Sequence, residues 1–203
     1  QRSLVGSEMC IRDRNVEHIS AYHLIYEEDT PIYNMLKQHQ ICEVDEDSSL
    51  QFFTLLIEHL QNAGYEHYEI SNFCLPGLHS RHNSSYWTEK QYLGCGPSAH
   101  SYNGISRQWN VASLDKYIEG ISSGNPTFEV EELDLYTRYN DFVITHIRTQ
   151  WGMPLPKLGK QYGEELYKYC LRMATPHLQQ GTLEIKNAVS YTHLRAHETT
   201  LHL

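Results

Sequence analysis

The sequence predicts an α/β domain followed by a smaller helical domain, on two observations. First, His18–Leu24 and Tyr65–Ile70 have the composition of short strands, and Asp47–Ala63 between them carries apolar residues at helical spacing. Strand, helix and strand of this length form a βαβ unit, which builds parallel sheets or barrels. Second, helical patterns replace this organisation after Gly124-Asn125-Pro126.

Each element of the first domain has recognisable ends. Proline fixes φ and disfavours helix in the residue before it, so Glu27–Pro31 ends the first strand. Asp47, Ser48 or Ser49 can cap the helix, and Gly64 suits its carboxyl end. The apolar stripe of this helix consists of Leu50, Phe53, Leu56, Ile57 and Leu60.

The segment Ser71–Trp109 has little periodicity and reads as one long loop. Loops of this length in compact domains are usually functional or disordered. Its aromatic residues argue against disorder. They are Phe73, Tyr86, Trp87, Tyr92, Tyr102 and Trp109.

The second part of the chain is expected to be a small winged-helix-like domain, truncated before its wing is complete. A short helix, Ser113–Ser122, precedes the domain boundary, which we expect near Gly124–Glu129. The elements predicted beyond it are a helix at Glu131–Arg148, a helix at Gly163–Gln180 bent or split by Pro176, and a strand beginning at Leu183-Glu184-Ile185.

Both ends of the chain read as translated sequencing adapter. Val189–Thr199 is VSYTHLRAHET and Leu4–Asp13 is LVGSEMCIRD, and the two strings correspond to opposite strands of one transposase adapter. We therefore expect residues 1–14 to be an artefactual leader and 189–203 an artefactual tail that pack against nothing. The remaining segments are 15–124, the α/β part, and 125–188, the helical part.

Composition narrows the functional classes. The formal net charge is −9 without a basic stripe, which argues against a nucleic-acid surface. No apolar run approaches the length of a membrane span. The cysteines are widely spaced, with no CxxC or CxxxCxxC motif, which favours free thiols in a reducing cytoplasm over a disulfide framework.

Four strings carry the strongest functional signal. They are HISAYHLIYEEDTPIY (His18–Tyr33), YEISNFCLPG (Tyr68–Gly77), SRHNSSYW (Ser80–Trp87) and YLGCGPSAHSYNG (Tyr92–Gly104). Together, in this order and at these gaps, they resemble the radical S-adenosylmethionine (SAM) heme chaperone family HemW, which is related to oxygen-independent coproporphyrinogen III oxidase. The resemblance covers nearly all of residues 15–188.

The resemblance implies the carboxyl-terminal part of a partial (β/α) barrel, with a 4Fe-4S cluster, SAM and a porphyrin at its mouth. The cluster cysteines and the SAM-binding strands of that family lie upstream of the residues matched here. We therefore expect this chain alone to bind neither cluster nor SAM and to be inactive as an enzyme. Heme is the expected ligand, and an unidentified heme-acceptor protein is the expected partner.

The candidate pocket residues come from the motif strings. Strand ends face the active site in barrel enzymes, arginine pairs with carboxylates such as propionates, aromatic faces cover a macrocycle, and imidazole ligates iron. Tyr22 and His23 alternate, so one of them should face the barrel interior. The candidates are His23, Glu69, Asn72, Arg81, His82, Asn83, Trp87, Ser98 and His100.

Structural readings compete with these functional ones. Gly94, Gly96 and Pro97 suit a tight turn with close approach to a ligand, but an ordinary turn at the end of a strand is the more common reason for this pattern. Ser98, His100 and Tyr102 alternate and could line a cavity. An isolated histidine after a strand is more often structural than a ligand.

The leading functional hypothesis is therefore a heme carrier that passes heme to an acceptor protein. The alternative within the same superfamily is a coproporphyrinogen III oxidase that decarboxylates two propionates with a 5′-deoxyadenosyl radical. A third hypothesis is that the helical part is a protein-docking module and the barrel remnant is inert.

Overall fold

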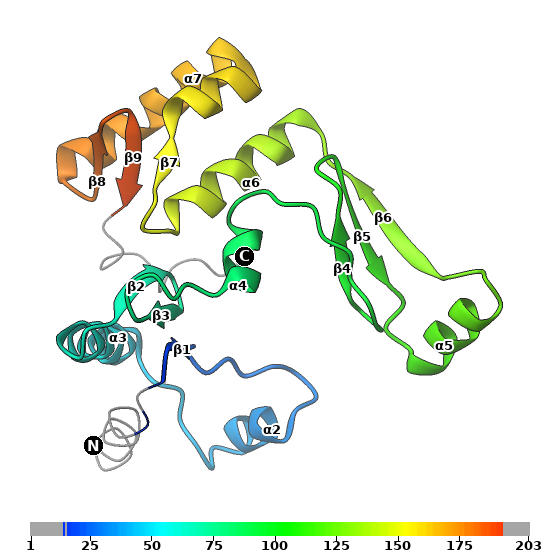
Figure 1. Ribbon diagram of the computed structural model, residues 1–203. Coiled ribbons are helices and arrows are strands. Elements are labelled where there is room, and N and C mark those ends of the chain that lie inside the picture. The colour runs from blue at the N-terminus through cyan, green and yellow to red at the C-terminus, as the bar shows by residue number, and fades with distance from the viewer. Residues whose placement is uncertain (1–13, 15, 193–203) are drawn as a thin grey trace. The chain divides into compact units, whose positions relative to one another are not determined.

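The computed structural model describes Arg14 and residues 16–192, which form two compact units divided between Ser80 and Arg81 (Figure 1). This division does not coincide with the boundary expected near Gly124–Glu129. The reason is that strand β6 (Phe128–Glu132), directly after that segment, pairs along its whole length with β5 (Ser106–Asn110). The predicted linker is therefore tied into a sheet.

The first unit contains a three-stranded sheet in the order β1-β3-β2. Its strands are β1 (His18–Ser20), β2 (Glu66–Glu69) and β3 (Asn72–Cys74). The predicted parallel βαβ pairing is not found among the described residues. Both β1 and β2 pair antiparallel with β3, which lies between them because the chain reverses tightly after Glu69.

Helix α3 (Glu46–Asn62) covers one face of this sheet (Figure 1). Its N-cap is Asp45, whose carboxylate accepts a hydrogen bond from the Ser48 backbone N–H at 2.9 Å, so the cap precedes the predicted positions. Phe53, Ile57 and Leu60 pack on Phe73 of β3. A short helix, α2 (Pro31–Lys37), has Thr30 as its N-cap and buries none of its residues.

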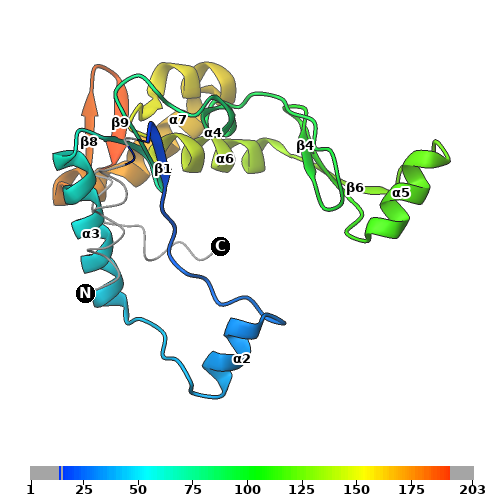
Figure 2. The same cartoon turned by 60° about the horizontal axis from the view of Figure 1, so that its bottom comes forward.

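The second unit begins with α4 (Arg81–Tyr86) and a second sheet, ordered β4-β5-β6, which includes β4 (His100–Tyr102). The sheet lies at one end of the unit with α5 (Leu114–Ser122), as Figure 2 shows. Part of the segment predicted as a long loop is therefore helix or strand. Its strands of three to five residues are too short to produce a visible alternation.

The remainder of the second unit is a helix pair with a third sheet, ordered β7-β9-β8. These elements are α6 (Leu135–Ile147), β7 (Met153–Pro154), α7 (Leu155–Gln180), β8 (Leu183–Lys186) and β9 (Val189–Thr192). The break in α7 is at Gly163, with φ 85° and ψ 169°, and not at Pro176, which lies inside the helix.

Strand β9 corrects the expectation that everything after Ala188 packs against nothing. Val189–Thr192 is the central strand of the third sheet, and Ser190 is 1% exposed. Gly152 makes room for it, because a Cβ there would lie 2.7 Å from the Ser190 carbonyl oxygen. Backbone pairing requires only residues that tolerate extended structure, and Val, Tyr and Thr favour it, whatever the origin of the segment. Residues 1–13 and 193–203 lie outside the described part.

Candidate functional site

The candidate residues fall in both units. His23, Glu69 and Asn72 belong to the first unit, whereas the other six belong to the second. From their places at the predicted strand ends we expect Glu69, Asn72, Arg81, His82 and His100 to share one barrel rim. Because these residues fall in both units, this expectation stays a prediction.

In the first unit, Glu69 and Asn72 form a buried polar cluster with Ser20. Glu69 is 2% exposed and Asn72 is 4% exposed. The Asn72 side-chain amide donates to the Glu69 carboxylate and its oxygen accepts from the Ser20 hydroxyl. Because these contacts satisfy a carboxylate and an amide that are withdrawn from water, the cluster has the character of an internal framework.

His23 does not alternate with Tyr22 within a strand, as the sequence predicted, because β1 ends at Ser20. Both side chains are exposed. The His23 ring lies 5.5 Å from the Phe53 ring, and its Nδ1 lies 2.9 Å from the Ser49 hydroxyl. His23 therefore contacts α3 and leaves Nε2 as its available nitrogen.

In the second unit, the glycine motif shapes the backbone under His100. A Cβ on Gly94 would lie 2.1 Å from the His100 carbonyl oxygen, so only glycine fits there. The buried Asn110 side chain donates to the carbonyl oxygens of Gly94 and Gly96. The close approach predicted for this turn is therefore made to the chain's own strand β4.

Four rings follow one another beside β4. Neighbouring centroids in the series His82, Tyr86, Tyr92 and Tyr102 are separated by 5.1, 4.9 and 6.0 Å. Tyr92 also forms a backbone bridge with Tyr102. Burial raises the pKa of Tyr92 and of Tyr102, so both phenols stay protonated at neutral pH. Tyr92 thus joins the site although the sequence indicated only Tyr102 as a possible cavity-lining residue.

His100 lies on the same strand face as Tyr102, opposite Trp109 of β5. The His100 and Trp109 rings are 5.9 Å apart, and the His100 side chain is exposed. Among the described residues, the ring nitrogens of His100 have no hydrogen-bonding partner. His82, by contrast, has its Nε2 at 3.3 Å from the Tyr86 hydroxyl. Of the two candidate histidines in this unit, His100 is therefore the one whose ring nitrogens are more available.

The remaining candidates are less well placed around this surface. Ser98 precedes β4 with φ 57°, so the predicted alternation holds for His100 and Tyr102 and is wrong for Ser98. Arg81 is exposed at the start of α4. Trp87 is partly buried directly after α4, and Asn83 lies within that helix.

The arginine beside the aromatic series is Arg107, which was not among the candidates selected from the sequence. Arg107 lies opposite Tyr102 in the ladder, and its guanidinium pairs with the Asp141 carboxylate of α6. This hydrogen bond raises the pKa of Arg107. Lys157 and Gln161 of α7 both donate to the Glu89 carboxylate, the lysine at 2.5 Å and the glutamine at 3.0 Å. These contacts attach the sheet region to α6 and α7.

The surface formed by His82, Tyr86, Tyr92, His100, Tyr102, Arg107 and Trp109 is called the aromatic face below. It combines exposed imidazole, aromatic rings and a guanidinium that already pairs with Asp141, and groups of these kinds can contact an iron porphyrin with propionate side chains. The described cysteines do not come together as the thiolate ligands of an iron–sulfur cluster would. Within residues 16–192 they lie far apart in sequence, two exposed and two buried, and no three come together.

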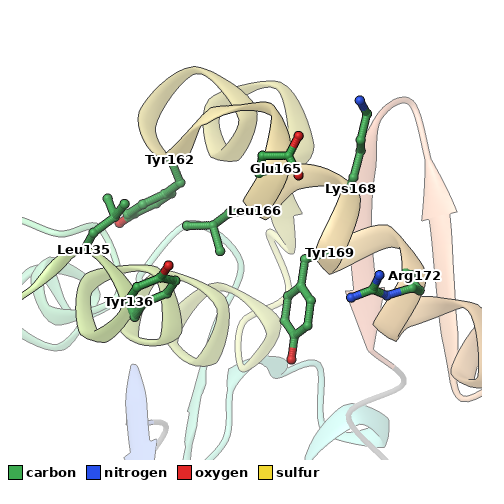
Figure 3. A pocket seen from close by; sticks show the side chains of 8 residues that line it. All are labelled: Leu135, Tyr136, Tyr162, Glu165, Leu166, Lys168, Tyr169 and Arg172. Carbon is green, nitrogen blue, oxygen red and sulfur yellow. The ribbon is translucent and has the colours of Figure 1, made fainter.

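A separate hollow of about 470 Å³ lies between α6 and α7 (Figure 3). No candidate residue from the sequence lines it. Arg172 stacks on the Tyr169 ring at 5.3 Å, so a cation and aromatic surface meet at its mouth. The lining residues are Leu135, Tyr136, Tyr162, Glu165, Leu166, Lys168, Tyr169 and Arg172.

No family model matches the sequence. Among curated proteins, the chain is 34% identical over 157 residues to the heme chaperone HemW of Mycobacterium tuberculosis, covering 77% of this chain and 40% of that protein. The HemW of Bacillus subtilis is 29% identical over 153 residues, again covering 40% of its length. The bovine mitochondrial radical S-adenosyl methionine domain-containing protein 1 is 35% identical over 99 residues, or 49% of this chain and 22% of that protein.

Among solved structures, coproporphyrinogen III oxidase (HemN) from Escherichia coli, described as a radical SAM enzyme, matches with a TM-score of 0.72. The match covers 95% of this chain and 48% of that chain at 14% sequence identity. It shows a shared mixed α/β fold, without showing a closed barrel. The chain spans 40% of the length of the first curated relatives and is HemW-like over that part.

Proposed function

We propose that this chain supplies the heme-binding part of a heme chaperone that passes heme to an acceptor protein. The observation that carries the proposal is the similarity to HemW proteins of two bacterial species over three quarters of the chain. The aromatic face supports it, because this face offers heme the chemistry it needs at the surface of the second unit.

His100 is the first candidate for the axial ligand. Its ring is exposed, its nitrogens have no partner among the described residues, and Trp109 offers an aromatic surface beside it. His82 and His23 are the second and third candidates, since each already has one ring nitrogen near a hydroxyl group. When bound, heme iron would accept a nitrogen lone pair from one of these residues.

The test is a titration of the purified chain with ferric heme, followed by absorption spectroscopy. We expect His100→Ala to shift or abolish the histidine-ligated Soret band and to weaken binding at least tenfold. His39→Ala, at an exposed histidine in the first unit, is the matched control and should leave the spectrum unchanged. Unchanged spectra in His23→Ala, His82→Ala and His100→Ala would remove these histidines from the proposal.

The hollow between α6 and α7 favours a second candidate function, protein docking by the helical part. Tyr136 at its rim is 65% exposed, and exposed aromatic residues beside a cation are common in protein interfaces. Tyr136→Ala should then weaken capture of a heme acceptor and leave the heme spectrum unchanged. The oxidase alternative is tested in the full-length parent, by release of carbon dioxide from coproporphyrinogen III.

A further inference from the structure

We propose that Glu66, Cys74 and His79 of the first unit form a binding site for one zinc ion. This cluster lies outside the aromatic face, and no candidate residue from the sequence belongs to it. The carboxylate oxygen, the sulfur and the imidazole nitrogen all lie within 4.8 Å of one another. It is the one such group of three among the residues that the structure describes.

The sheet register brings the first two ligands together. Glu66 of β2 and Cys74 of β3 are direct cross-strand partners, so their side chains leave the same face of the sheet. That face is opposite the one on which Phe73 packs against α3. Cys74 is fully buried, whereas the Glu66 side chain is 39% exposed, so a fixed sulfur faces an adjustable carboxylate.

A tight turn returns the third ligand to the same place. The Leu78 N–H donates to the Leu75 carbonyl oxygen at 2.9 Å, and Gly77 has φ 78° within this turn. The His79 Nε2 then lies 3.3 Å from the Glu66 Oε2. The Tyr68 ring meets the His79 ring edge-on at 5.0 Å and limits its orientation.

The chemistry of the three donors selects the metal. Sulfur, nitrogen and oxygen together suit zinc, which is borderline in softness, better than calcium or magnesium, which prefer oxygen alone. Tetrahedral zinc with bonds of about 2.0–2.3 Å holds its ligand atoms about 3.5 Å apart. Because Glu66 and His79 are partly exposed, small side-chain rotations can close the remaining distance. Cys74 would lose its thiol proton on binding.

Three protein ligands leave the fourth position of zinc open. His18 lies on the other side of Cys74 in the ladder, with its Nε2 bonded to the Tyr68 hydroxyl at 2.8 Å, and is not one of the three. A water molecule or a small anionic ligand would complete the coordination. Sites with three protein ligands and one open position are typical of zinc that takes part in chemistry, whereas structural zinc usually has four.

The experiment uses the metal-free full chain, with zinc titrated by calorimetry and cobalt(II) used as a spectroscopic probe. We expect one ion per chain and a near-ultraviolet charge-transfer band from thiolate to cobalt. Cys74→Ser should remove the band. His79→Gln and Glu66→Gln should each weaken zinc binding at least tenfold and leave the thermal midpoint in a chelator unchanged.

Two control variants separate this cluster from other metal donors in the chain. Cys42→Ser with Cys95→Ser removes both exposed cysteines, and replacement of His193, His197 and His202 by glutamine removes the histidines near the carboxyl end. Both controls should keep the band and the affinity. No stoichiometric binding, or binding that survives His79→Gln and Glu66→Gln, would overturn the proposal even if Cys74→Ser fails to fold.

Discussion

The two sheets β1-β3-β2 and β4-β5-β6 treat polar side chains in opposite ways. The first buries Glu69 and Asn72 and pairs them with each other, whereas the second leaves His100 exposed beside Trp109. Buried and hydrogen-bonded groups stabilise one arrangement, but they have little capacity left for a ligand. The motif strings therefore contain framework residues, such as Glu69 and Asn72, together with available residues, such as His100.

The largest expected effect comes from removing core volume in one unit. Phe73 is fully buried and stacks on His67 at 4.4 Å, so Phe73→Ala should cost about 3–5 kcal/mol of the free energy of unfolding. Phe52→Ala, at a side chain 47% exposed on the same helix–sheet unit, should cost under about 1 kcal/mol.

Urea denaturation measures the cost of Phe73→Ala, and hydrogen exchange locates it. Protection should fall in residues 16–80 before it falls in 81–192, because the two units have separate cores. Equal loss of protection in both units would contradict this separation and weaken the comparison between their sheets.

The next effect tests the framework directly. Asn72→Ala removes the amide that donates to the buried Glu69 carboxylate, and should cost about 1–3 kcal/mol because a buried acceptor loses its partner. Asn125→Ala, at an exposed asparagine, is the matched control and should change stability by about 0.5 kcal/mol or less. Thermal unfolding measures both. A neutral Asn72→Ala would mean that the cluster is not a framework.

A comparable or smaller loss of stability is expected from Gly94→Ala, with a consequence for the aromatic face. The added Cβ must displace the His100 backbone, which should cost about 1–3 kcal/mol. Heme affinity should fall with it, because His100 moves relative to Trp109. The control is Gly159→Ala in α7, where the nearest atom lies at 3.4 Å and alanine favours helix. Heme titration of both variants decides whether the glycine motif supports the ligand.

The smallest effect is a pH dependence shared by the two units. Burial lowers the pKa of His67 in the first unit and of His146 in the second. In the unfolded chain these two imidazoles become protonated near pH 6.5, whereas in the folded chain they become protonated only at lower pH. The free energy of unfolding should therefore fall as pH drops below about 6.5.

Thermal unfolding between pH 7.5 and 5.5 measures this dependence. His146→Gln should reduce the loss of stability of the second unit at low pH. The substitution removes a group whose pKa differs between the folded and unfolded states. His177→Gln, at an exposed histidine, should leave the fall in place. An unchanged slope in His146→Gln would show that other groups dominate the acid response.

The sequence predicted the elements whose signals are local. Asp47–Ala63 and Ser113–Ser122 agree with α3 and α5 to within a residue, because capping residues and helical spacing act over a few positions. The strand Tyr65–Ile70 is confirmed as β2. The pairing of β1 and β2 with β3 was missed, since a three-residue strand carries no periodic signal.

The candidate site was predictable where a residue's chemistry is independent of its neighbours. His82 and His100 were selected because imidazole is a ligand in any context, and the structure gives His100 available nitrogens. Arg107 and Tyr92 were not selected, because their importance depends on the ladder with Tyr102. The strand register that places Tyr92 and Arg107 beside Tyr102 is set by tertiary packing and cannot be inferred from the spacing of residues in the sequence.

Strand β9 gives the third sheet a property that its side chains do not reveal. The strand occupies the position between β7 and β8 chiefly through backbone hydrogen bonds, with Gly152 providing space for it. The same closeness makes the sheet sensitive to residue 152, because any residue larger than glycine there would push β9 away from β7.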